Sequence, residues 1–100
     1  MSVTNISTIH KTISSITLKW DPITSPNHTF SYIVHYKHKK HKSCKEDRQD
    51  AVWEKVKKMT ATTITAERLL PYSEYLFKIA AVVGEVMGNF IEYTETTSPM

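Results

Sequence analysis

The sequence has a single cysteine and only two glycines among its 100 residues. The lone Cys44 excludes a disulfide within the chain, and two glycines are too few for a glycine-rich phosphate-binding loop. No apolar run approaches the length of a membrane-spanning helix. No charged segment followed by an apolar one opens the chain, so we expect any secretory signal to lie outside this segment. The length predicts one domain over residues 1–100.

Enzymatic chemistry finds little support in the sequence. Ser73 and Ser98 lack the glycine-flanked turn that exposes a nucleophilic serine. The neighbouring carboxylates Glu46 and Asp47 fall in a polar segment that gives no context for a pocket. We therefore predict that the chain is not an enzyme and needs no cofactor.

Most of the chain consists of short stretches in which apolar and polar residues alternate, which is typical of β-strands. Ile16, Leu18 and Trp20, for example, fall on one face of a strand that Pro22 ends. The pattern predicts strands within residues 3–9, 12–20, 30–37, 52–58, 62–66, 69–82 and 89–97.

Two segments are less regular. Residues 38–50 are charged and show no periodicity, so we predict a long basic loop there. Residues 51–59 carry an apolar i, i+4 pair that a helix would tolerate, but we favour a strand. Gly84 and Gly88 bracket a connection of the length found in hairpins.

The segment 69–82, which reads LLPYSEYLFKIAAV, has the clearest pattern. Pro71 disfavours helix at Leu70, so the chain turns a corner before the strand begins. Tyr75 then starts a run of apolar residues at every second position. A tyrosine at this place in a β-sandwich packs its ring into the core, and its hydroxyl bonds the backbone a few residues upstream.

Three motifs together resemble the fibronectin type III domain: W-D-P at residues 20–22, Y-x-V-x-Y at 32–36, and L-x-P-x-x-x-Y-x-F-x-I-x-A at 69–81. The resemblance covers nearly the whole chain. It implies an all-β, immunoglobulin-like β-sandwich of seven strands without an inter-sheet disulfide. It favours an inward Trp53, and it implies a structural core that includes Trp20, Tyr32, Tyr36, Leu69 and Tyr75.

The predicted loop and the end of the strand before it are rich in lysine. A cluster of this kind attracts sulfated glycans and other polyanions, although a charged loop can equally serve only to stay solvated. Nucleic acid is disfavoured, because no aromatic platforms are interleaved with the basic residues and no recognition helix is predicted. The candidate residues for binding an anionic glycan are Lys37, Lys39, Lys40, Lys42 and Lys45.

His35, His38, His41 and Cys44 recur with a period of three, and imidazole and thiolate are preferred ligands of zinc. On a strand, however, this period alternates between the two faces, and the surrounding lysines repel a cation. We therefore predict no metal site. We expect Cys44 to be an unpaired surface thiol that either links to another chain or has no role.

Two sequons bear on the cellular compartment. Asn5-Ile6-Ser7 and Asn27-His28-Thr29 can each accept an N-linked glycan in a secreted protein, because neither has proline in the middle position. Both fall where we expect exposed backbone. The pair favours an extracellular setting, either in a membrane receptor or in a secreted protein.

The resemblance implies a non-catalytic module of a larger receptor or cell-adhesion protein, acting as a spacer and a protein-interaction domain. The expected partners are other domains of the same parent and a protein ligand, and the isolated domain is expected to be monomeric. One alternative is a glycosaminoglycan-binding module that binds heparan sulfate through residues 37–45. Another is a module of an intracellular scaffold, for which the sequons would be accidental.

Overall fold

The computed structural model describes residues 2–43, 45 and 52–99, with only the backbone of residues 55–57. Cys44 and residues 46–51, which include the last part of the predicted loop, therefore lie outside the described residues. The strands are β1 Ser7–Lys11, β2 Ile16–Lys19, β3 Ser31–His41, β4 Glu54–Met59, β5 Thr63–Ala66, β6 Ser73–Val83, β7 Val86–Met87 and β8 Ile91–Thr96.

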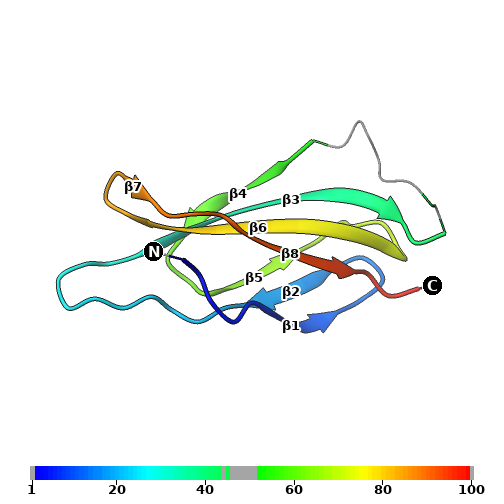
Figure 1. The fold of residues 1–100 in the computed structure, drawn as a ribbon. Coiled ribbons are helices and arrows are strands. Elements are labelled where there is room, and N and C mark those ends of the chain that lie inside the picture. Colours follow the sequence, from blue (N-terminus) through cyan, green and yellow to red (C-terminus); the bar gives the residue numbers. More distant parts are fainter. Residues whose placement is uncertain (1, 44, 46–51, 100) are drawn as a thin grey trace.

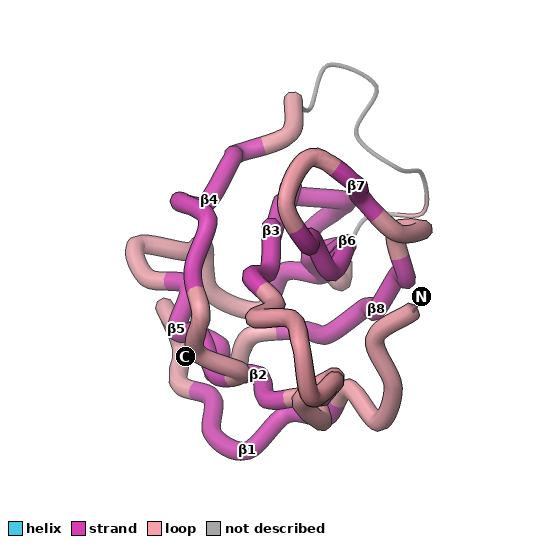
Figure 2. The backbone as a smooth tube through the Cα atoms, turned by 90° about the vertical axis from the view of Figure 1, so that its left-hand side faces the viewer, coloured by secondary structure: helices cyan, strands magenta, loops and turns pink. Residues whose placement is uncertain are grey.

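These strands form two antiparallel sheets packed face to face (Figures 1 and 2). One sheet has the order β1-β2-β5; the other has the order β4-β3-β6-β7, and β8 also pairs with β6. No helix occurs in the described ranges. The predicted β-sandwich is confirmed. The structure has eight strands instead of seven, because the two-residue β7 pairs with the end of β6 across a turn that begins at Gly84, whose φ is 58°.

The inward faces of both sheets supply the core. Ile16, Leu18 and Trp20 line one side, as their alternation predicts, and the ring of Trp20 meets that of Tyr32 edge to face at 5.6 Å between centroids. Leu69 and Tyr75 are buried as well, whereas Tyr36 is half-buried and packs against the buried residues of the hydrophobic core.

The corner before β6 is held by hydrogen bonds. Leu70 N–H donates to the Tyr75 hydroxyl over 2.8 Å, which is the contact that the sequence pattern predicts. Tyr72 has a φ of 46°, in the left-handed region that costs an ordinary residue about 1–2 kcal/mol. Its N–H donates to the Ser98 carbonyl and its carbonyl accepts from Lys42 N–H, so the surrounding backbone holds this conformation.

The main differences from the sequence-based predictions concern two strands and one side chain. The first strand spans Ser7–Lys11 instead of residues 3–9, and β3 continues to His41 instead of ending at Lys37. The extension forms because the equally long β6 supplies partners as far as Ser73, which lies opposite His41. Trp53 also lies on the outer face of the larger sheet, so the expectation that it points inward is wrong.

Candidate functional site

The outer face of the five-stranded sheet carries most of the predicted basic residues. Along β3, Val34 and Tyr36 point into the sandwich, so His35 and Lys37 point away from it. A β-bulge between His38 and Lys40 then inserts one extra residue. Residues that the sequence placed in a loop are therefore fixed on a sheet.

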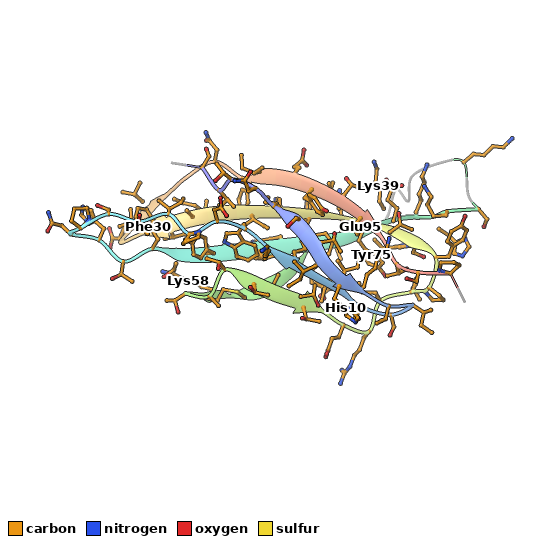
Figure 3. The ribbon with its side chains drawn as sticks, turned by 90° about the horizontal axis from the view of Figure 1, so that it is seen from below. His10, Phe30, Lys39, Lys58, Tyr75 and Glu95 are labelled. Atoms are coloured by element: carbon orange, nitrogen blue, oxygen red, sulfur yellow. The ribbon has the colours of Figure 1, made fainter. Side chains whose placement is uncertain are left out.

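A single carboxylate, that of Glu74, pairs with two ammonium groups near the bulge. Glu74 accepts ion pairs from Lys39 Nζ at 3.3 Å and from Lys42 Nζ at 3.8 Å, and it lies directly opposite Lys40 in the pairing of β3 with β6. The Glu74 side chain is 13% exposed, against 33% and 40% for its two partners. Among the described side chains at this end of the face, where Figure 3 labels Lys39, the lysines outnumber the carboxylates.

Two aromatic rings organise the other basic residues of this face. Lys37 Nζ lies 4.7 Å and Lys78 Nζ 4.2 Å from the centroid of the Trp53 ring. Lys78 Nζ also lies 4.7 Å from the centroid of Phe90, whose ring meets His35 edge to face. We call Lys37, Lys78, Trp53 and Phe90 the aromatic–lysine cluster.

The sequence analysis did not find Lys78, Trp53 or Phe90 as parts of a site. For Lys78 the signal was present, because it alternates with the buried Phe77 and Ile79 and must therefore point outward. Among the predicted basic residues, Lys37 joins the aromatic–lysine cluster and three others surround Glu74, whereas Lys45 is exposed and makes no ion pair within the described residues.

The three histidines that recur with a period of three in the sequence do not converge in the structure. His35 faces outward to Phe90, His38 packs against Tyr75 at 5.2 Å between ring centroids, and His41 meets the ring of Tyr72. Within the part of the chain that the structure describes, no three His, Cys, Asp or Glu residues are grouped as metal ligands.

A polar contact joins the edges of the two sheets on the opposite side of the sandwich. Thr8 on β1 donates to Glu95 on β8 over 2.6 Å and shares a 2.8 Å hydrogen bond with the Tyr93 hydroxyl. Lys11 adds an ion pair to Glu95 at 3.1 Å. Burial acts to raise the pKa of Glu95, but the hydrogen bonds from Thr8, Thr96 N–H and Lys11 outweigh it and lower the pKa.

The pKa of Tyr36 also departs from its ordinary value. Burial raises the pKa of its phenol, and the negative charges of Glu54 and of an ionised Tyr75 act in the same direction. The hydroxyl therefore stays protonated well into the alkaline range.

Both sequon asparagines are exposed. Asn5 has a φ of 56°, and its Nδ2 donates to Asp21 over 2.6 Å. Asn27 lies in the turn that the His28 N–H to Ser25 carbonyl hydrogen bond closes. No helix in the described residues is long and apolar enough to cross a membrane.

Comparison with known proteins identifies the class of this sandwich. The family model for the fibronectin type III domain matches residues 1–97, and the chain therefore belongs to the fibronectin type III family. Proteins of this class are typically modules of larger proteins. No curated protein sequence matches the chain.

Solved structures give the same fold at low sequence identity. A computationally redesigned β-sandwich protein is 22% identical with a TM-score of 0.71, and the match covers 100% of this chain and 97% of that one. The fibronectin type III domain of human collagen XX is 20% identical with a TM-score of 0.73, covering 97% and 92%. The domain of human fibronectin type III domain containing protein 3 is 19% identical with a TM-score of 0.74, covering 99% and 86%.

Proposed function

We propose that this domain is a non-catalytic, extracellular module of a larger receptor or cell-adhesion protein, in which it acts as a spacer and a protein-interaction domain. The shape supports this role. The molecule measures 48 × 26 × 19 Å, and its N- and C-terminal ends lie toward opposite ends of the long axis (Figure 1). Neighbouring domains of the same parent are then held apart by most of the length of the sandwich.

The exposure of Asn5 and Asn27 supports the extracellular setting, and their glycosylation tests it. The chain is expressed behind a secretory signal in cultured animal cells, and the secreted product is treated with an N-glycanase. We expect the enzyme to increase electrophoretic mobility, and we expect Asn27→Gln and Asn5→Gln each to remove one glycan. A secreted chain without glycan on either asparagine would contradict the extracellular proposal and favour the intracellular scaffold.

A second candidate function is the binding of a sulfated glycan such as heparan sulfate. The observation that favours it is the extension of β3, which fixes Lys39 and Lys40 on a sheet instead of in a loop and places them on the same strand as Lys37. Lysines held on a strand lose less conformational entropy when they bind a polyanion.

Retention on a heparin column tests this second function. We expect elution above physiological salt for the wild type and early elution for the Lys39→Ser, Lys40→Ser, Lys42→Ser triple variant, because the interaction is mainly electrostatic. Lys19→Ser is a single-charge control, since Lys19 is exposed on β2 in the other sheet. Elution of the triple variant at the wild-type salt concentration would contradict glycan binding.

The isolated domain is proposed to be a monomer, and its thiol offers the test. Sedimentation in the presence of reductant should give the monomer mass, and oxidation should slowly give dimers that Cys44→Ser prevents. A dimer of the Cys44→Ser variant under reducing conditions would contradict the monomer.

A further inference from the structure

The aromatic–lysine cluster places two ammonium groups against one indole ring, and within the described residues neither of them forms an ion pair with a carboxylate. Among the described residues, ion pairs within 4 Å involve only Lys11, Lys39 and Lys42 as cations. Glu92 lies opposite Lys78 in the pairing of β6 with β8, yet it forms no such pair. The rings attract the cations but do not cancel their charge, so the mutual repulsion of Lys37 and Lys78 remains.

The rings also fix where the two charges are. A free lysine side chain loses up to about 2 kcal/mol of rotamer entropy when it is immobilised. Contact with Trp53 on both lysines, and with Phe90 on Lys78, limits this freedom before any ligand arrives. An ammonium group has three N–H donors, and those directed away from a ring stay available to an anion.

The cluster continues into the other basic residues along β3. Lys37 belongs to the cluster, and Lys39 and Lys40 follow it on the same strand across the bulge. With a rise of about 3.3 Å per residue, the strip from Lys37 to Lys40 is about 10 Å long. A small anion reaches only one end of this strip. An extended polyanion can contact both the aromatic–lysine cluster and the lysines that pair with Glu74.

We propose that the aromatic–lysine cluster is the main anchoring site for a sulfated polysaccharide chain that lies along β3. Lys37 and Lys78 bind sulfate groups, while Trp53 and Phe90 hold the two lysines in position. This inference rests on the second proposed function and moves its centre from the predicted loop to the outer face of the sheet.

The chemistry of the face favours a sulfated glycan over single-stranded nucleic acid. Every described cation along it is a lysine, which binds an anion as a point charge, whereas arginine has the rigid fork suited to nucleic-acid recognition. The two rings are also occupied by the lysines, whereas single-stranded nucleic acid needs open rings on which bases stack.

Calorimetric titration with a heparin octasaccharide at about 0.15 M salt tests the inference. We expect Lys78→Ser to weaken binding about five- to ten-fold. The slope of log affinity against log salt concentration should also fall by roughly one, because one fewer counterion is released on binding. Lys19→Ser makes the same change of charge on the other sheet and should leave the affinity within about two-fold.

Trp53→Ala separates positioning from charge. It removes no cation, so we expect about three-fold weaker binding with an unchanged salt dependence, because both lysines still neutralise sulfates but are no longer held. Circular dichroism checks that each variant is folded. If Trp53→Ala does not fold, Lys78→Ser still tests the anchoring site, because it changes only a surface residue.

The outcomes distinguish the proposal that the domain binds a sulfated glycan from the proposal that the aromatic–lysine cluster is its main anchoring site. If the wild type does not bind the octasaccharide, glycan binding and the anchoring site both fail. If the wild type and the Lys39→Ser, Lys40→Ser, Lys42→Ser triple variant differ in affinity but Lys78→Ser binds like Lys19→Ser, glycan binding stands and the anchoring site is overturned. Equal affinity for single-stranded DNA of matched charge would overturn the assignment to a sulfated glycan.

Discussion

Thr97 gives the sharpest test of how the corner before β6 is stabilised. The residue follows β8 and is 1% exposed, so its hydroxyl is out of reach of bulk water. Its Oγ1 accepts from Ser73 N–H at 3.0 Å and donates to the Leu70 carbonyl at 2.6 Å. One hydroxyl therefore joins the C-terminal end of the chain to both sides of the corner.

Thr97→Val keeps the shape of the side chain and removes both hydrogen bonds. Each buried backbone group left without a partner costs about 1–3 kcal/mol. Because Leu70 is partly exposed and its carbonyl regains some hydration, the two together should cost about 2–4 kcal/mol. For a domain with a total stability of about 5–15 kcal/mol, this is a large loss.

The matched control is Thr97→Ser, which keeps the hydroxyl and loses one methyl group, at a cost of about 1 kcal/mol. Urea unfolding followed by circular dichroism gives both values, provided that the slope with urea is the same in all three proteins. The reasoning is refuted if the valine variant is as stable as the serine variant.

The strands that face a buried core on one side and solvent on the other were predictable from the sequence. Leu18 in the second strand and Trp20 just after it both have polar neighbours, and Lys78 separates Phe77 from Ile79 in the sixth strand, so the period of two is visible. The corner at Tyr75 was also predictable, because proline and tyrosine at this spacing have a specific structural use.

The end of β3 was not predictable in the same way. His38 and His41 lie toward the end of the sandwich, where the inward positions are also polar, so no alternation distinguishes strand from loop. The bulge between His38 and Lys40 further breaks the period. This segment is a strand because it pairs with Glu74 and its neighbours on β6. Such a non-local pairing cannot be recognised from the sequence of the segment alone.

The orientation of Trp53 in the aromatic–lysine cluster was also not predictable from the sequence. Val52 and Trp53 are adjacent and both apolar, so local pattern cannot decide which one points inward. The structure leaves Val52 72% exposed and sets Trp53 against two lysines, one of which, Lys78, lies 25 residues further along the chain. Such a site depends on the register of three strands and becomes visible only when they are paired.

Three further predictions concern stability. Trp20→Ala should cost about 3–5 kcal/mol in urea unfolding, since it empties the centre of the core; a cost below 1 kcal/mol would contradict that placement. Tyr75→Phe should cost only about 0.5–1.5 kcal/mol, because the ring stays and one hydrogen bond is lost; a cost equal to that of Trp20→Ala would contradict this account. The contact of Glu95 with Thr8 and Lys11 should make the domain sensitive to acid. Because folding lowers the pKa of Glu95 from its ordinary 4.5, its contribution is fully present above that pH and is lost as the pH falls through the folded-state value. The urea midpoints of wild type and Glu95→Gln should therefore differ at pH 6 and converge as the pH falls below the folded-state pKa of Glu95, where the carboxyl of the wild type is also neutral. A difference in urea midpoint between the two proteins that stays constant across this pH range would show that the charge of Glu95 does not stabilise the contact between the two sheets.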